Sequence, residues 1–363
     1  MKQDNITKRN LIYLEVLRII AIYLVLFNHT NGFLLYATHY PLPTSYLYLV
    51  ISIISKVAVP VFFMISGALL LEKEESYLIL YRKRILKYAI VLILFSFVYF
   101  AYFSYSNGLP IKINDFLKLL YSSNANAHFW FLYDYLAFLV MLPFIRKIVK
   151  SLTNKEYVYI LIINIIFVGI IPIIEYLVNG GTIKYNPCFD LSAIVCSSLV
   201  YSLMGYFLNH QINCQNVKTK HLIIGFIFCL IAISITMGIT IYVLKTEQIY
   251  TSNGLIDGNL VQKFLNNLII VPAMYLFLVI KKIFTKINIP NKLQTLIKIC
   301  GSCVFGVYIF EFVLRVKTVF IYDFLQGYLP IMVAYLLWTL IIIVIGFIII
   351  FLLKKIPIIR KLF

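Results

Sequence analysis

Long apolar runs separated by short polar connectors fill most of this chain and limit what it can fold into. A helix rises about 1.5 Å per residue, so about 20 apolar residues cross the roughly 30 Å hydrocarbon core of a bilayer. Hydrophobic residues make up 62% of the 363 residues, whereas soluble globular proteins contain about half. The pattern predicts an all-α integral membrane protein and excludes a soluble core.

Ten of these runs are candidate transmembrane helices, and the fourth is the shortest. They cover residues 11–36, 46–71, 85–105, 129–144, 157–178, 191–208, 222–244, 264–280, 304–322 and 331–353. We find no internal repeat, no low-complexity tract and no soluble domain at either end of the sequence. The sequence therefore predicts a single membrane domain over residues 1–363, built as one bundle of about ten transmembrane helices.

The net charge of +18 comes mainly from lysines and arginines in alternate connectors between the runs. These residues precede the first run, follow every even-numbered run and are scarce in the other connectors. Cytoplasmic connectors of membrane proteins carry such an excess of Lys and Arg. We predict that both termini are cytoplasmic. We expect no nucleic-acid binding, because the charge does not form a patch on a soluble domain.

The first run carries three ionisable residues, Glu15, Arg18 and His29. At 100° per residue, Arg18 and His29 lie within about 20° of each other and about 16 Å apart along the helix, with Glu15 on nearly the same stripe. A charge at the bilayer centre costs at least about 2.5 kcal/mol, so we expect the stripe to face other helices. Either Arg18 snorkels while paired with Glu15 and His29 is hydrogen-bonded in the core, or the three residues form a functional site.

The second run contains Lys56, far from either end, followed by Pro60 and Gly67. Proline favours a kink or break in the helix, and glycine permits a close approach of another backbone. Lys56 has two interpretations, a structural ion pair with an acid such as Glu15 or Glu311 and a contact to substrate.

Two further pairs of residues combine polar chemistry with membrane positions. In the ninth run, Glu311 lies near mid-membrane, and Arg315 follows at i+4, a spacing that allows an ion pair. His128 and Trp130 open the fourth run at the outer interface, where aromatic anchors are common. Anchoring and substrate contact are both open for this second pair. The preceding connector has a turn signal at 107–110 and then an amphipathic stretch at 115–121 that predicts a short surface helix.

Arg82 and Arg84 follow an acidic group at 72–75 and open the third run. If the helix includes both arginines, they cannot share one face, because they are two positions apart. If it does not, they form a fork at the membrane surface that suits bidentate binding of phosphates.

Cys300 and Cys303 have motif-like spacing but no neighbouring Cys or His, so we expect no metal site.

These features resemble, in order, the signature of the membrane-bound acyltransferase 3 family. An acid precedes an Arg and a His that are separated by ten residues in the first run. "VPVFFMISG" follows in the second run, then the Arg-x-Arg at 82 and 84, "HFWFL" at 128–132 and "FGVYIF" in the ninth run. The resemblance covers residues 11–353.

The resemblance implies a multi-pass acyltransferase of a bacterial plasma membrane. Such enzymes commonly move an acetyl group from acetyl-CoA to a hydroxyl or amine of a cell-surface carbohydrate or a lipid-linked glycan precursor. It implies that His29 and Arg18 are the catalytic pair, and that Arg82 and Arg84 contact the phosphates of the acyl-CoA donor.

Three further positions compare with the family in different ways. Lys56 stands where members often carry a basic residue. Glu15 commonly is Asp in the family, which is a small change. Glu311 often is His there, so no histidine role carries over to it, although a carboxylate still accepts a proton or a sugar hydroxyl.

Acyl transfer to an alcohol needs a base for the hydroxyl proton and positive groups or dipoles for the developing oxyanion. His29 is the candidate base, because neutral imidazole accepts a proton near neutral pH. Arg18 suits thioester positioning or charge compensation. His29 lies roughly 27 Å along the first run, towards the outer side, so we expect the donor to reach in from the cytoplasm and the acceptor to arrive from outside.

Two other classes of function use the same features. A transporter of a polar solute would line its path with this stripe. A non-catalytic envelope-assembly protein would keep the fold without the chemistry.

Overall fold

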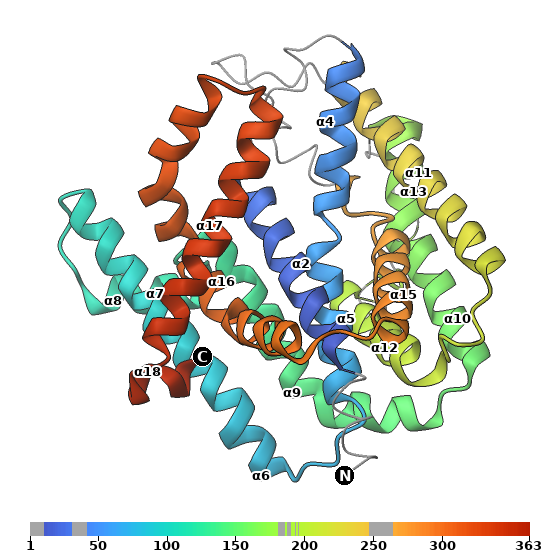
Figure 1. Cartoon of the computed structure of the whole chain (residues 1–363), viewed down its shortest axis with the longest axis horizontal. Helices are drawn as coiled ribbons and strands as arrows, with labels where there is room; N and C mark the ends of the chain where they lie inside the picture. Colours follow the sequence, from blue (N-terminus) through green and yellow to red (C-terminus); the bar gives the residue numbers. More distant parts are fainter. Residues whose placement is uncertain are drawn as a thin grey trace. The chain divides into compact units, whose positions relative to one another are not determined.

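The computed structural model (Figure 1) has helices as its regular structure, and no strand occurs among the residues it describes. The described residues are 11–30, 42–180, 186, 190–192, 194, 196–246 and 264–363. Eight helices in this part of the chain are long and apolar enough to cross a membrane: Ile12–Thr30, Tyr46–Leu70, Tyr77–Ser106, Ala127–Ser151, Asn154–Val178, Thr219–Val243, Asn291–Gln326 and Ile331–Leu353. The prediction of an all-α integral membrane protein is confirmed.

Two of the predicted spans are not among these eight helices. The predicted span 191–208 contains α12 (Ser197–Tyr206), which continues into the π-helical turn η5 (Phe207–Gln211). The predicted span 264–280 overlaps α15 (Ile270–Lys286), a helix of 17 residues that begins and ends six residues later. The number of crossings and the side on which the termini lie therefore stay predictions.

The described helices group into two compact units. The first takes its described residues from 1–69, 153–357 and 363, and the second consists of 70–152 and 358–362. The last helix, α18 (Pro357–Leu362), lies almost wholly in the second unit. The single membrane domain over 1–363 stays a prediction.

Helix α2 (Ile12–Thr30) is central to the first unit. It packs against α4 (Leu42–Ser55), α15, α16 (Asn291–Gln326) and α17 (Ile331–Leu353). Apolar side chains on several sides of α2 are buried by these neighbours, which explains how one helix holds both a core and an ionisable stripe. Residues 31–36, the end of the first predicted span, lie outside the described residues.

Helices α16 and α17 form an antiparallel hairpin, visible as adjacent orange and red ribbons in Figure 1. Near the turn, Trp338 donates from Nε1 to Thr318 Oγ1 over 3.0 Å. At the other end of the hairpin, Lys354 Nζ donates to the Ser302 carbonyl over 2.9 Å. At 36 residues, α16 is much longer than the predicted span 304–322, because its helix continues through polar residues at both ends.

The second predicted span is a broken helix. Helix α4 ends at Ser55 and α5 (Ala58–Leu70) begins after Lys56 and Val57, which form a turn. Pro60 is the third residue of α5, where its missing N–H removes no intrahelical bond, because the first turn of a helix has no partners for its donors. The predicted kink or break is confirmed at this position.

Helix α5 also touches the backbone of α12, as Gly67 predicted. A Cβ added to Gly67 would lie 1.9 Å from the Ser202 carbonyl oxygen, and one added to Gly205 would lie 2.0 Å from the Met64 carbonyl oxygen. Neither helix has room for a side chain at the crossing. The close approach therefore depends on a glycine from each helix.

A continuous helical stretch begins the next part of the first unit. It consists of α10 (Asn154–Asn164), the π-helical η3 (Ile165–Ile170) and α11 (Ile171–Asn179). Its start is fixed by a capping box, in which the Thr153 N–H donates to Glu156 Oε2 over 2.6 Å. Such reciprocal bonds satisfy donors that the first helical turn cannot pair.

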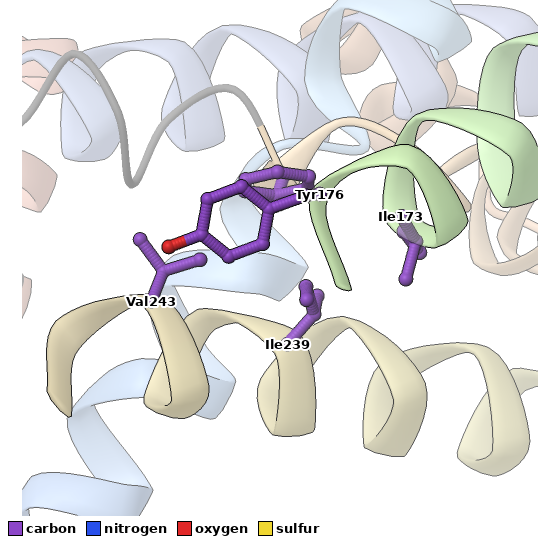
Figure 2. Close-up of a cluster of buried hydrophobic side chains, with 5 residues drawn as sticks. Ile173, Tyr176, Ile239 and Val243 are labelled. Atoms are coloured by element: carbon purple, nitrogen blue, oxygen red, sulfur yellow. The ribbon is translucent and has the colours of Figure 1, made fainter. Parts of the chain in front are cut away.

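Helix α11 packs against α13 (Thr219–Thr246) through buried side chains. Figure 2 shows Tyr176 of α11 beside Val243 of α13, and Ile173 with Ile239 in the same cluster. The Tyr176 hydroxyl lies 3.1 Å from Thr246 Oγ1, so the ring is buried while its polar end is hydrogen-bonded.

The second unit starts with one continuous helix made of α6 (Tyr77–Leu80), the π-helical η1 (Tyr81–Ile85) and α7 (Leu86–Ser106). The predicted turn follows, with Gly108 at a φ of 66°. The predicted surface helix is present as α8 (Ile113–Ser122), whose Phe116 is buried against rings of α7. The short η2 (Ala127–Phe129) and α9 (Trp130–Ser151) complete the unit.

Candidate functional site

His29, Glu311 and Arg315 form one cluster in the first unit. His29 Nδ1, from the last turn of α2, lies 3.3 Å from Glu311 Oε2. Arg315, one turn further along α16, places Nε 3.8 Å from the same oxygen. The predicted i, i+4 pair of Glu311 and Arg315 is confirmed. The contact with His29 joins that pair to the ionisable stripe of α2.

Glu311 is 1% exposed, so its carboxylate depends on these partners. A buried carboxylate is costly unless positive or hydrogen-bonding groups compensate it. Arg315 is held in turn above the Phe312 ring, with its Cζ 5.7 Å from the ring centroid. Glu311 Oε2 faces Nδ1 of His29, so the carboxylate and the imidazole are direct neighbours.

Glu15 and Arg18 form a second cluster nearer the start of α2. Arg18 Nη1 donates to Glu15 Oε1 over 2.7 Å, which confirms the predicted pair. The other carboxylate oxygen, Oε2, lies against Gly301 of α16, where an added Cβ would be 2.1 Å away. The same two helices therefore hold both clusters, and they run in the same direction past each other. The expectation that the stripe faces other helices is confirmed.

Lys56 does not join either acid that the sequence suggested. Glu15 is bound by Arg18, and Glu311 by His29 and Arg315. Among the residues that the structure describes, no ion pair involves Lys56. The predicted ion pair with Glu15 or Glu311 is wrong, because nearer cations occupy both carboxylates. A substrate contact of Lys56 stays a prediction.

The two arginines of the Arg-x-Arg motif lie in the second unit and have different surroundings. Both belong to η1, inside a continuous helix, so they leave it on different faces and form no fork. Arg84 binds Glu75 through two hydrogen bonds, of 3.0 and 2.5 Å. Arg82 is exposed. The fork interpretation is wrong, because the helix starts before Arg82 rather than after Arg84.

Glu75 is shared with a third arginine. Arg146 of α9 donates from Nη2 to Glu75 Oε2 over 3.0 Å and from Nε to the Leu70 carbonyl over 2.9 Å. The hydrogen bond from Arg84 and then the one from Arg146 lower the pKa of Glu75 from 4.5 to about 2, against the opposing effect of burial. This cluster ties the 70–76 connector to two helices of the second unit.

His128 and Trp130 have opposite environments. His128 is 3% exposed, with Nδ1 2.8 Å from Asn126 Oδ1 and its ring edge-on to Tyr99 and Phe129. Trp130, in contrast, is 44% exposed, as an interfacial anchor would be. A buried ring and an exposed ring do not make a common binding surface, and the substrate role of each stays a prediction.

Comparison with known families decides the class of the protein. A family model described as an acyltransferase domain matches residues 11–355. The chain belongs to the acyltransferase 3 family. Neither the curated proteins nor the solved structures that were compared contain a match. With its apolar helices, this acyltransferase 3 protein is a multi-pass membrane acyltransferase.

For an acyltransferase 3 protein, the first unit holds half of the candidate site residues in two clusters. It pairs Glu15 with Arg18, and it joins His29 to Glu311 and Arg315. Arg82, Arg84, His128 and Trp130 belong to the second unit. No group of three or more His, Cys, Asp or Glu side chains suited to a metal ion occurs in the described part of the acyltransferase 3 chain.

Sequence reasoning missed a polar network at the start of α2. The Tyr13 hydroxyl donates to Asn209 Oδ1, and Lys281 Nζ donates to the carbonyls of Leu208, Asn209 and Ile212 over 2.7, 2.8 and 2.9 Å. These three bonds satisfy all three donors of the ammonium group. The network is structural in this acyltransferase 3 protein, and only the basic composition near 281 hinted at it.

Proposed function

We propose that this membrane acyltransferase moves an acetyl group from acetyl-CoA to a hydroxyl of a cell-surface carbohydrate or of a lipid-linked envelope precursor. The observation that carries the proposal is the contact of His29 Nδ1 with the buried Glu311 carboxylate, in a chain of the acyltransferase 3 family. A carboxylate on one nitrogen of an imidazole prepares the other nitrogen to act as a base. The proposed setting is a bacterial plasma membrane.

In the proposed reaction, the acceptor hydroxyl oxygen attacks the thioester carbonyl carbon. His29 Nε2 takes the hydroxyl proton as the new carbon–oxygen bond forms. The carbon–sulfur bond then breaks, and the imidazolium returns the proton to the leaving thiolate. Glu311 orients the ring and compensates the charge that His29 gains, as carboxylates do in other acyl-transfer sites.

The cations have separate parts in this proposal. Arg18, oriented by Glu15, positions the thioester or compensates charge near the developing oxyanion. Arg82 contacts the donor phosphates, because it is exposed and a guanidinium suits phosphate binding. Arg84 shapes that region through its two bonds to Glu75 and contributes less directly. In the first unit, Lys56 and Arg315 are the proposed contacts of the acceptor.

The test uses purified protein in lipid vesicles, labelled acetyl-CoA and a fraction of envelope glycans. His29→Ala should lower acetyl transfer by about 10²- to 10⁴-fold, since a general base contributes about that much. Glu311→Gln should lower it by up to about 10⁴-fold, because an amide keeps the volume but no longer favours the Nδ1-protonated tautomer. His221→Ala, at an exposed histidine of α13, is the control and should transfer at the wild-type rate.

The assay also separates the competing classes of function. Label that becomes covalently attached to glycan supports the enzyme. Solute exchange across the vesicle membrane without any chemical change would instead support a transporter. Transfer at the wild-type rate by a folded His29→Ala protein would remove His29 from the role of base.

A further inference from the structure

We infer that Gly301 is a positioning residue that seats Glu15, and through it Arg18, for acyl transfer. The catalytic part of this inference rests on the proposed function, whereas the seating rests on the geometry of two helices. Glu15 approaches α16 at Gly301, where an added Cβ would lie 2.1 Å from Oε2. The glycine therefore allows the Glu15 carboxylate to keep this position, from which a methyl group would displace it.

The distances identify Glu15 as the group that needs the space. A Cβ at position 301 would lie 2.1 Å from Glu15 Oε2, 3.0 Å from its Cδ and 3.1 Å from its Cβ, and these are the nearest atoms. The Glu15 side chain thus fills the volume that a methyl group at 301 would take. Arg18 holds the other oxygen, Oε1, at 2.7 Å. If the carboxylate moves, the guanidinium moves with it or loses its partner.

Movement of the carboxylate end alone would not fully relieve a contact with a methyl group at 301, because the Cβ of Glu15 would still lie 3.1 Å from it. Gly301 lies in the interior of a 36-residue helix that also carries Glu311. Helix α16 therefore contacts the ionisable stripe of α2 at two points along its length. Gly301 lies against Glu15, and Glu311 lies against His29. Any shift of α16 that relieves a clash at 301 also changes the spacing of His29 and Glu311.

The effect of a larger residue at 301 should therefore depend on the length of the acidic side chain at 15. Aspartate at position 15 would withdraw the carboxylate by one methylene and open space for a methyl group at 301. Gly301→Ala should lower acetyl transfer by about 10- to 100-fold, since misplacement by about 1 Å costs an enzyme that much. The rate of acetyl transfer by the double variant Gly301→Ala with Glu15→Asp should be within about threefold of the rate of Glu15→Asp alone. The two substitutions are then not additive, as is usual for residues in contact.

Gly306→Ala is the matched control on the same helix. A Cβ at 306 would meet Ile350 of α17, with the nearest atom 2.6 Å away, and it would not meet Glu15. Gly306→Ala should lower acetyl transfer by the same factor in the wild-type and Glu15→Asp backgrounds. If Gly301→Ala behaves in the same additive way, the positioning role is wrong and Gly301 serves packing alone.

Thermal unfolding in detergent separates failure of the inference from failure of the proposed function. Should the wild-type protein transfer no acetyl group, the proposed function fails. The unfolding temperatures of the wild type, the two single variants and the double variant still show whether residue 301 and the Glu15 side chain compete for the same space. A smaller loss of unfolding temperature for Gly301→Ala in the Glu15→Asp background supports it. Equal losses in both backgrounds overturn it.

Discussion

At the scale of single residues, the shared carboxylate of Glu75 makes a prediction about pH. Its pKa in the folded protein is about 2, below the ordinary value of 4.5. The ionised form therefore stabilises the fold above pH 4.5, and this contribution falls as the pH drops towards 2. Wild-type protein should unfold a few degrees above Glu75→Gln at neutral pH, and the difference should shrink below pH 4.5. Thermal unfolding in detergent at a series of pH values measures it.

Glu74→Gln is the control for this prediction. Glu74 also binds a cation, Lys150, over 2.5 Å, but both side chains are largely exposed. Exposed ion pairs contribute little to stability, so this variant should unfold close to the wild type throughout. A difference for Glu75→Gln that stays constant from neutral pH down to about pH 2 would contradict the assignment.

Local pairs could be predicted at the residue scale, whereas contacts between helices could not. Glu15 with Arg18, and Glu311 with Arg315, are three and four positions apart, where helix geometry alone brings side chains together. The contact of His29 with Glu311 depends on which helices are neighbours, and one sequence does not contain that information. For the same reason, the partners suggested for Lys56 were wrong, and the binding of Arg84 to Glu75 was not foreseen.

At the scale of helices, the crossing of α5 and α12 makes a prediction about packing. Gly67→Ala would place a methyl group 1.9 Å from the Ser202 carbonyl oxygen, so the two helices must separate. Overpacking of this kind costs about 1–3 kcal/mol or more, and the unfolding temperature in detergent should fall clearly. Gly238→Ala, in α13, is the control, because nothing lies within 4 Å of the added Cβ. It should leave stability unchanged or raise it slightly.

Equal unfolding temperatures for Gly67→Ala and the wild type would contradict the close crossing of α5 and α12.

The helix break at Pro60 and the close approach at Gly67 could be predicted from the sequence, because each follows from the backbone chemistry of a single residue. Helix ends could not be predicted in this way. Apolar runs mark the residues that favour lipid, whereas the helices continue beyond these runs into polar residues. The basic residues 82–84 lie inside a helix that begins at Tyr77, and α16 starts at Asn291 rather than near 304.

At the scale of the whole molecule, contacts in the first unit bring four helix ends to one level. The Tyr13 hydroxyl, near the start of α2, binds Asn209 in η5. Asn209 Nδ2 donates to the Ala68 carbonyl near the end of α5, over 3.3 Å. Lys281, near the end of α15, binds carbonyls at the end of η5. We therefore predict that the start of α2 and the ends of α5, η5 and α15 lie on the same side of the membrane.

This arrangement favours ten crossings over eight. If α12 and α15 did not cross, the connector 212–218 would lie on the side where α11 ends, opposite to the start of α2. With ten crossings, the connectors 212–218 and 287–290 lie on the side of the start of α2, as the contacts require. The lysines at 218 and 220 predict that this is the cytoplasmic side, by the positive-inside rule.

Labelling of single cysteines in a cysteine-free background tests this topology. Gln215→Cys and Asn288→Cys, both at exposed positions, should react with a membrane-impermeant maleimide only in inside-out vesicles. Gly108→Cys, in the connector that follows the third predicted span, should react only in right-side-out vesicles. If Gln215→Cys reacts from the same side as Gly108→Cys, then α12 does not cross and the protein has fewer than ten spans. In that case Asn209 of η5 could not lie at the same membrane face as the start of α2, as its contact with Tyr13 requires.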